Sequence, residues 1–324
     1  MKRIISLVVS LGILVIIYTR IDVANLIDVF QNSDPLWMVV SLGMVIPITA
    51  VTSWRLQQIV PSKAKLGFGE ANKLILAAST LNMVLPSKMG DIAKAYFMRD
   101  RGNLSGSLSL SIVVFEKASD MLSLLLWCAF GLLLYPQKDF LFWVMTVGVV
   151  GGLILGMLLL GSKAFAQFFF QLAKRIAPKK IKQKLHTMQV SWSEMHDYFW
   201  GDSRQLAVIS LTSIFIWFLH LLQIWFFILA LQAYTPFLTN LALSPLAILA
   251  GLLPLTFAGV GTRDAALVAF YAPYFDAATG AALGLLCTSR YFLPAVGGLP
   301  FLSQYISAVK AFKKPLRPKT INRS

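Results

Sequence analysis

The sequence is short of charge. Only 13% of its 324 residues are Asp, Glu, Lys or Arg, against roughly 25% in a soluble domain, and 57% are hydrophobic. A chain this apolar would expose large hydrophobic patches to water, so an ordinary soluble fold is excluded and the bilayer is its solvent. Strands of alternating polarity are also lacking, which argues against a barrel and leaves helices to satisfy the backbone hydrogen bonds.

Several chemical signatures are missing as well. The two cysteines, Cys128 and Cys287, lie inside apolar runs, so we interpret them as small buried hydrophobes rather than a disulfide or metal pair. Metal-ligand spacings, phosphate-binding loops, a Ser/His/Asp set and a nucleophile elbow are all lacking, so we predict no metal, cofactor or catalytic residue. The formal net charge of +15 comes without a nucleic-acid-binding module, so nucleic acid is not an expected partner.

What the sequence does contain is a series of apolar runs that approach the ~20 residues needed to span a bilayer. The predicted spans lie at about 4–19, 35–54, 104–135, 140–161, 206–231 and from 277 onwards. The first run resembles a signal peptide, but no small-residue cleavage site follows it. We therefore expect a retained first span with a cytoplasmic amino terminus.

Two further apolar stretches are interrupted, and they share one plan. Residues 70–98 contain Leu85-Pro86-Ser87-Lys88-Met89-Gly90-Asp91-Ile92-Ala93-Lys94. Residues 245–271 contain Leu253-Pro254 followed by Gly259-Val260-Gly261-Thr262-Arg263-Asp264. Each stretch contains Leu-Pro, then glycine, and then an acid close to a base. The residues expected to break the helices are Pro86, Gly90, Pro254, Gly259 and Gly261. Matched interruptions in two halves are typical of a transporter binding site.

The charge distribution predicts that both interrupted stretches are re-entrant helical hairpins. Arg99 and Arg101 follow the first stretch directly, and a stretch that dips in and returns keeps them inside, as the positive-inside rule requires. The second stretch then enters from the outer side, after an uncharged outer loop at residues 233–244. Hairpins that enter from opposite sides are expected of an inverted repeat.

The predicted fold is therefore all-α, a polytopic membrane protein of about six spans plus two re-entrant helical hairpins. A single integral membrane domain covers 1–324, with approximate halves 1–161 and 206–312 and a basic tail at 313–324. Residues 162–205 join the halves as a basic cytoplasmic segment. Within it, one helix face lies in the headgroup plane and is formed by Ile181, Leu185, Met188, Trp192, Met195 and Phe199. We expect both termini in the cytoplasm, where Trp54-Arg55 anchors the second span.

Charges at membrane depth define the candidate site, because each is costly there. The bases are Lys88, Lys94, Lys117, Arg263 and Arg290, and the supporting acids are Asp91, Glu116, Asp120 and Asp264. The surplus base favours an anionic ligand, such as a phospholipid or polyprenyl phosphate headgroup. Ion pairs that only lock the hairpins in place are the alternative. Ser87 and Thr262 are expected to cap the half-helices, whose first N–H groups would face the anion.

These motifs resemble the flippase-like membrane domain family of lysylphosphatidylglycerol synthase. The family's Trp-Arg, Asn-x-x-x-Pro and Gly-Glu-x-x-Arg patterns are matched by Trp54-Arg55, Asn82 with Pro86, and Gly90-Asp91-Ile92-Ala93-Lys94. Its Glu-Arg pair with a later Asp is matched by Glu116-Lys117 and Asp120. Leu253-Pro254 matches its Leu-Pro motif, and Gly259–Asp264 matches its Gly-x-Gly-x-Arg-Glu motif. Arg290 matches its late Arg, and Pro294 with Gly297-Gly298 matches its Pro-x-x-Gly-Gly end. This sequence has Asp in place of the family's Glu at 91 and 264, and Lys in place of its Arg at 94 and 117. The sign of each charge is kept, while the length and the hydrogen-bonding geometry of the side chain change.

The resemblance implies a lipid flippase-like transporter of a prokaryotic cytoplasmic (inner) membrane. It would move an anionic phospholipid or a polyprenyl-phosphate-linked lipid between leaflets, with the phosphate near the five bases. The family's synthases carry an additional soluble aminoacyl-transferase domain, for which this chain has no room, so aminoacyl transfer is not expected.

Two other functions stay open. One is an intramembrane lipid-modifying enzyme that uses the carboxylates as acid and base. The other is a non-transporting membrane partner of a separate synthase or glycosyltransferase. The expected partners are the lipid substrate, an anionic lipid surface under the basic segments, and either a second copy of the chain or a separate lipid-modifying enzyme.

Overall fold

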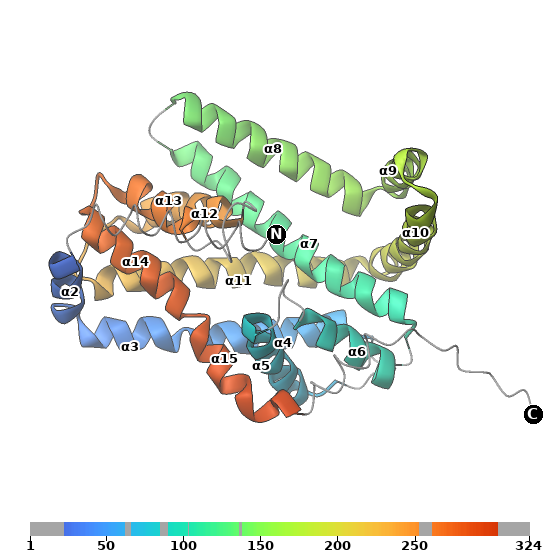
Figure 1. Cartoon of the computed structure of the whole chain (residues 1–324), viewed down its shortest axis with the longest axis horizontal. Coiled ribbons are helices and arrows are strands. Elements are labelled where there is room, and N and C mark those ends of the chain that lie inside the picture. The colour runs from blue at the N-terminus through green and yellow to red at the C-terminus, as the bar shows by residue number, and fades with distance from the viewer. Residues whose placement is uncertain are drawn as a thin grey trace, which may run out of the picture.

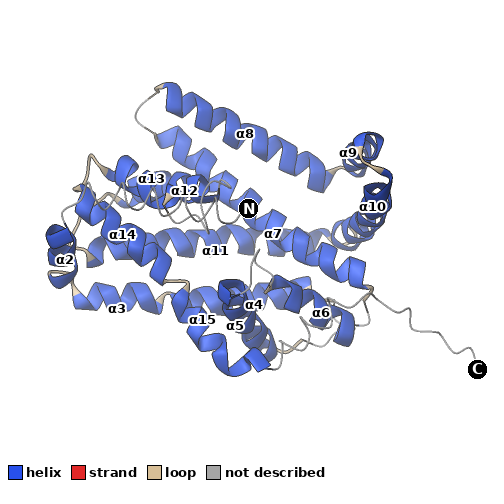
Figure 2. Ribbon diagram, in the orientation of Figure 1, coloured by secondary structure: helices blue, strands red, loops and turns tan. Residues whose placement is uncertain are grey.

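The computed structural model describes residues 23–61, 66–84, 90–102, 104–135, 138–252 and 261–303, and the elements in these ranges are all helical (Figures 1 and 2). In chain order they are α2 Val23–Gln31, α3 Pro35–Gly43, α4 Val45–Ile59, α5 Phe68–Val84, α6 Asp91–Gly102, α7 Gly106–Leu134, α8 Phe140–Gly161, α9 Lys163–Ile176, α10 Lys179–Trp200, α11 Ser203–Ala230, α12 Phe237–Leu252, α13 Thr262–Tyr271, α14 Ala277–Ser289, α15 Phe292–Gly298 and the short 3₁₀ helix η4 Leu299–Phe301.

Five segments are long and apolar enough to cross a membrane: Pro35–Ile59, Gly106–Leu134, Phe140–Gly161, Ser203–Ala230 and Ala277–Phe301. They confirm the spans predicted from residue 35 onwards and make the chain a polytopic integral membrane protein. The predicted span at 4–19 and the basic tail at 313–324 lie outside the described residues. Of the helix-breaking residues, Pro86, Pro254 and Gly259 lie outside them too.

Polar caps set where the long helices begin. Asp34 accepts hydrogen bonds from the backbone N–H groups of Leu36 and Trp37, and Pro35 occupies the first helical position of α3. The side chains of Asp139, Asp202 and Asp276 start α8, α11 and α14 in the same way, and Ser105 starts α7. Each cap satisfies at least one backbone donor that would otherwise be left without a partner in an apolar setting.

The structure corrects one prediction in the second half. Residues 237–244 are not loop, because α12 begins at Phe237 and the side chains from Asn240 to Ser244 are buried. The polar side chains there explain the error: Asn240 donates to the carbonyl of Leu221 and accepts from the hydroxyls of Ser244 and Tyr271, so these polar groups are satisfied within the core.

The last predicted span is confirmed, but it consists of two helices. The first ends at Ser289 and the second begins at Phe292, with Arg290 and Tyr291 in the turn between α14 and α15. In Figure 1 α15 continues onwards from the end of α14. A buried arginine therefore occupies a joint in a segment that would otherwise span as a single helix.

The described parts of the two interrupted stretches form two helices each, α5 followed by α6 and α12 followed by α13. Both pairs contact α7, and each pair also contacts one helix of the α14–α15 segment. In the first pair, α5 packs against α15 and α6 packs against α7; in the second, α12 packs against α7 and α13 packs against α14. In Figure 1 the two pairs lie on opposite sides of α11, which runs alongside α3 and α4.

The cytoplasmic segment predicted at 162–205 contains two helices, α9 and α10, separated by Pro178. The predicted apolar face of α10 is confirmed only in its second half, where Met195 and Phe199 are buried and the ring of Phe199 stacks on Phe115 of α7, with 3.9 Å between the centroids. Towards the beginning of α10, Ile181 and Met188 are exposed.

Gly90 allows the two helices of the first pair to approach each other. A Cβ at this position would lie 2.1 Å from the carbonyl oxygen of Ala78, which is backbone and cannot move aside easily. We therefore expect Gly90→Ala to lower the free energy of unfolding by about 1–3 kcal/mol through overpacking. Thermal unfolding in detergent would measure it, with Gly148→Ala as the control, because nothing lies within 4 Å of a Cβ at Gly148. Equal melting temperatures for the two variants would contradict this packing.

Candidate functional site

The first group of charges lies where α4, α6 and α7 meet. Lys94 of α6 has its Nζ atom 3.0 and 3.1 Å from the two carboxylate oxygens of Glu116 on α7. The same Nζ atom lies 3.1 Å from Oδ1 of Asp91, the first residue of α6. Lys94 and Glu116 are 3% and 1% exposed, so this ion pair lies in the interior of the protein.

Arg55 completes this group, and here a sequence-based prediction was wrong. Arg55 does not anchor α4 at a water face: it is 2% exposed, and its guanidinium group reaches Glu116 Oε1 at 3.1 Å and both carboxylate oxygens of Asp120. It also donates to Ser213 Oγ of α11 at 2.8 Å. The resemblance had already singled out Trp54-Arg55, and that was the signal that could have placed this arginine in the site.

The first group is electrically balanced. Glu116 and Asp120 are one helical turn apart on α7, so both face the same neighbours. Lys117 lies 3.6 Å from Asp91 and 3.9 Å from Asp120 but is 46% exposed, which makes it the outermost member. The three bases Arg55, Lys94 and Lys117 thus meet the three acids Asp91, Glu116 and Asp120.

The second group lies at the beginning of α13. Arg263 donates from Nε and Nη2 to Oδ1 of Asp264, at 3.0 and 2.6 Å. The other carboxylate oxygen of Asp264 accepts the N–H of Gly261 at 3.0 Å. Gly261 has a φ of 101°, in the region that favours glycine, and it precedes the first helical residue, Thr262. The N-cap position is Gly261 and not the predicted Thr262, and the side chain of Asp264 accepts the N–H of this cap residue.

Arg263 is further tied to α14. Its Nη2 donates to the carbonyl of Gly284 at 3.1 Å and to Oγ1 of Thr288. These contacts make Arg263 a bridge between α13 and α14 rather than an open cation.

Arg290 differs from all of these bases. It is 4% exposed, yet the one hydrogen bond of its side chain among the described residues is from Nη2 to the hydroxyl of Tyr291, at 3.2 Å. The guanidinium carbon also lies 5.1 Å from the centre of the Tyr291 ring. Its Nε and Nη1 atoms are buried and have no hydrogen-bond partner in the described part of the chain. His220 of α11, whose Nδ1 is also buried without a partner there, lies within electrostatic range of Arg290 and Arg55.

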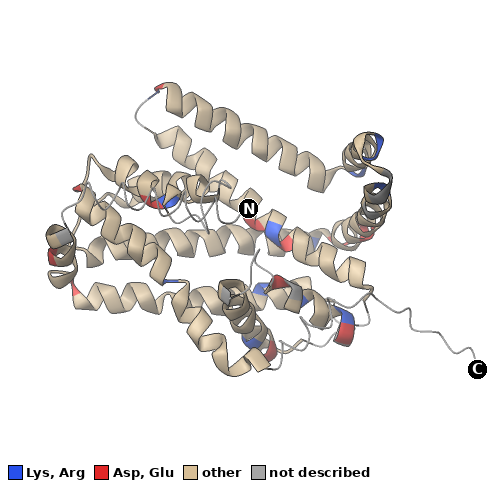
Figure 3. Ribbon diagram, in the orientation of Figure 1, with Lys and Arg blue, Asp and Glu red and all other residues tan. Residues whose placement is uncertain are grey.

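The structure thus divides the predicted site residues into two groups. Figure 3 marks charged residues at the middle of α7, on α13 and at the α14–α15 joint. Lys94, Lys117, Asp91, Glu116 and Asp120 come together with Arg55, and Arg263 comes together with Asp264. Lys88 lies outside the described residues. The two groups hold four bases and four acids, so they are electrically balanced. Arg290 belongs to neither group and is the base without a carboxylate among the described residues.

The comparisons with known proteins agree with this architecture. The chain matches the family described as the lysylphosphatidylglycerol synthase TM region over residues 3–298. The chain therefore belongs to this family of membrane domains associated with lipid modification and translocation. No curated protein matches it.

The buried Lys94–Glu116 pair can be tested by a double-mutant cycle. Glu116→Gln removes the carboxylate that Lys94 and Arg55 share, and breaking a buried pair in this way costs roughly 3–5 kcal/mol. In Lys94→Met/Glu116→Gln the destabilisation should be smaller than the sum of the two single changes, because no unpaired ammonium is left. Unfolding in detergent by heat or denaturant would measure it.

The matched control for this cycle is Lys163→Gln, which breaks the exposed ion pair with Asp197. An exposed pair contributes about 0–1 kcal/mol, so this variant should unfold close to the wild type. Additive effects of the Lys94 and Glu116 changes would show that the two side chains do not interact as described.

Proposed function

We propose that this protein is a flippase-like transporter that moves an anionic, phosphate-bearing lipid between the leaflets of the membrane. The observation that carries the proposal is the guanidinium group of Arg290, buried and without a carboxylate among the described residues. A buried charge without a partner is costly, so we expect Arg290 to pair with an anionic ligand while the protein functions. A planar guanidinium with two free N–H positions suits a phosphate oxygen pair.

The position of Arg290 supports a transport role. The residue lies in the turn between α14, which packs against α13, and α15, which packs against α5. A group bound to Arg290 would therefore be held at the joint between the two helix pairs. The packing of both pairs against α7 and against the α14–α15 segment is the arrangement expected of an inverted repeat, whose halves can rock around a central site.

A lipid suits the surroundings better than a free anion. The side chains of α8 face outward for most of its length; Trp143, Val147 and Ile154 are 59%, 72% and 55% exposed. In a bilayer these surfaces contact hydrocarbon, so the tails of a bound lipid would remain in the membrane while its phosphate reaches the interior. Membership of a family associated with lipid modification and translocation points the same way.

Transport is also favoured over lipid modification. A general acid or base needs a carboxyl group that can reach substrate. Glu116, Asp120 and Asp264 are each within hydrogen-bond distance of an arginine, and Asp91 is within that distance of Lys94. The acids therefore hold bases in place, which is the supporting role proposed for them.

The basic helices α9 and α10 are proposed to lie on the cytoplasmic face, against anionic headgroups, with both termini on that side of a prokaryotic inner membrane. Contact with a second copy, or with a separate lipid-modifying enzyme, is also part of this proposal.

Arg290→Gln tests the proposal in liposomes. Losing a charged hydrogen-bond donor to a phosphate costs about 1.5–3 kcal/mol, so transfer of a fluorescent anionic phospholipid should fall by roughly 10- to 100-fold. Because Nε and Nη1 of Arg290 have no partner in the described structure, the melting temperature should stay the same or rise. Arg204→Gln, at an exposed arginine of α11, is the matched control. Full transfer by Arg290→Gln, or its loss together with stability, would contradict the proposal.

A further inference from the structure

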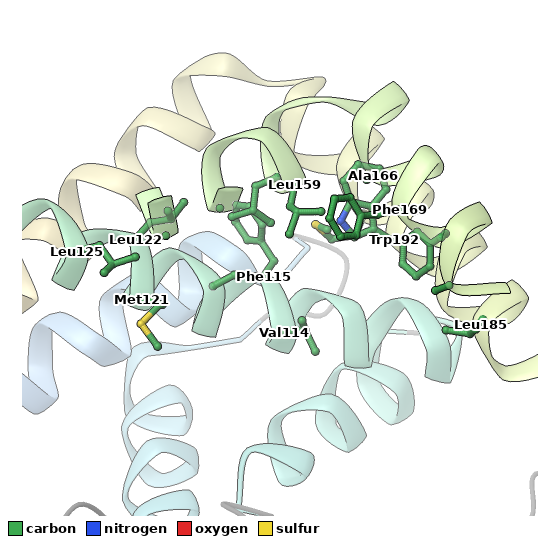
Figure 4. Close-up of a pocket in the computed structure, with 17 residues that line it drawn as sticks. Val114, Phe115, Met121, Leu122, Leu125, Leu159, Ala166, Phe169, Leu185 and Trp192 are labelled. Carbon is green, nitrogen blue, oxygen red and sulfur yellow. The ribbon is translucent and has the colours of Figure 1, made fainter. Parts of the chain in front are cut away.

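A second feature suited to lipid lies on the opposite face of α7. A partly open cavity of about 420 Å³ is lined by α7, α8, α9 and α10, and its volume lies within the roughly 300–1,000 Å³ range of small-molecule sites. Figure 4 shows its apolar lining, with Met121 and Leu122 of α7, Leu159 of α8, Phe169 of α9 and Trp192 of α10 around the space.

This cavity is separate from the charged groups described above. Val114, Ala118 and Met121 line it from α7, while Glu116 and Asp120 lie on the other side of that helix, towards α4 and α6. Side chains two residues apart on a helix point about 200° apart, so α7 stands between the two places. A molecule in the cavity is therefore separated from Glu116 and Asp120 by α7, while the exposed Lys117, one turn from both Val114 and Met121, lies on the cavity side of that helix.

The chemistry of the cavity selects an apolar occupant. The residues that line it are Val, Phe, Ala, Met, Leu, Gly and Trp, so they offer a charged or strongly polar molecule almost nothing to bind. The cavity adjoins α8, whose outward side chains contact hydrocarbon in a bilayer. Lipid chains are thus the apolar groups within reach, and filling the space with one removes the cost of an empty cavity.

One end of the cavity is basic. Ala173 and Leu185 line it, and they are followed directly in the chain by Lys174 and His186, whose Nζ and Nδ1 atoms lie 3.3 Å apart. α9 has no acidic residue, and α10 has none before Glu194. A phosphate at this end would meet positive charge without a competing carboxylate from these two helices.

We propose that this cavity binds one acyl chain of an anionic phospholipid, with the phosphate next to Lys174 and His186. The site is additional to the transport site around Arg290 and does not depend on it. A lipid bound in this cavity would hold α9 and α10 at the membrane by specific contacts, in addition to the attraction between their basic residues and anionic headgroups.

Photolabelling of the full chain in phosphatidylcholine nanodiscs tests this site. The probe is phosphatidylglycerol with a diazirine near the end of one acyl chain, and the comparison probe is phosphatidylcholine with the same chain. We expect the phosphatidylglycerol probe to label residues 114–125 of α7 and 185–195 of α10, mapped by mass spectrometry.

Ala173→Phe should lower this labelling about tenfold, because the ring excludes several methylene groups from the cavity. Ala164→Phe is the matched control: the same change in the same helix, at an exposed alanine that does not line the cavity. Lys174→Gln should weaken labelling by phosphatidylglycerol and leave that by phosphatidylcholine as it is. Melting temperatures of the variants would verify that they are folded.

Three results would overturn the proposal. One is labelling of the wild type confined to the outward side chains of α8. Another is equal labelling by the two probes, which would remove the anionic preference. The third is a lack of labelling on α7 and α10 in a protein that is dimeric in the nanodisc, which would make the cavity part of an interface between two copies. Since labelling is measured without transport, loss of transport in Arg290→Gln leaves this test unchanged.

Discussion

The ion pairs around Glu116 are the constraint on which the rest of the structure depends. A charge at membrane depth is tolerated only when other charges or dipoles compensate it. Glu116 meets this condition because it accepts hydrogen bonds from both Lys94 of α6 and Arg55 of α4. Asp120, one turn further along α7, also accepts from the guanidinium group of Arg55. Three helices far apart in the sequence are thereby fixed to one point. The position of the α5–α6 pair, and the distance between α4 and α7, follow from it.

Because the charges of the two groups are paired within the protein, the unpaired Arg290 indicates where an anionic ligand could bind. Asp264 bonds to Arg263 and to the N–H of Gly261, and the described residues offer Arg290 no carboxylate. The remaining arginine lies at a joint between two short helices, each of which contacts a different helix pair. An uncompensated cation at such a place suits a ligand that brings its own negative charge and couples the movement of the two pairs.

Much of this architecture could be predicted from the sequence, because long apolar runs and helix breaks depend on local composition. The spans from residue 35 onwards and the two interrupted stretches are examples. Three features could not be predicted in that way. Arg55 follows a tryptophan near a span end, as an interfacial anchor does, and only its distant partners Glu116 and Asp120 show that it is buried. The burial of Asn240 and Ser244 depends on Tyr271 and on the carbonyl of Leu221, and the break at Arg290 depends on packing against two separate helix pairs.

The most direct measurement is a cryo-EM structure of the protein in nanodiscs that contain phosphatidylglycerol. The account predicts density for a phosphate within hydrogen-bond distance of Nε or Nη1 of Arg290, and unbroken pairs between Glu116 and both Lys94 and Arg55. A carboxylate of the protein itself bonded to Arg290, with lipid phosphate found only at the outer surface, would contradict it.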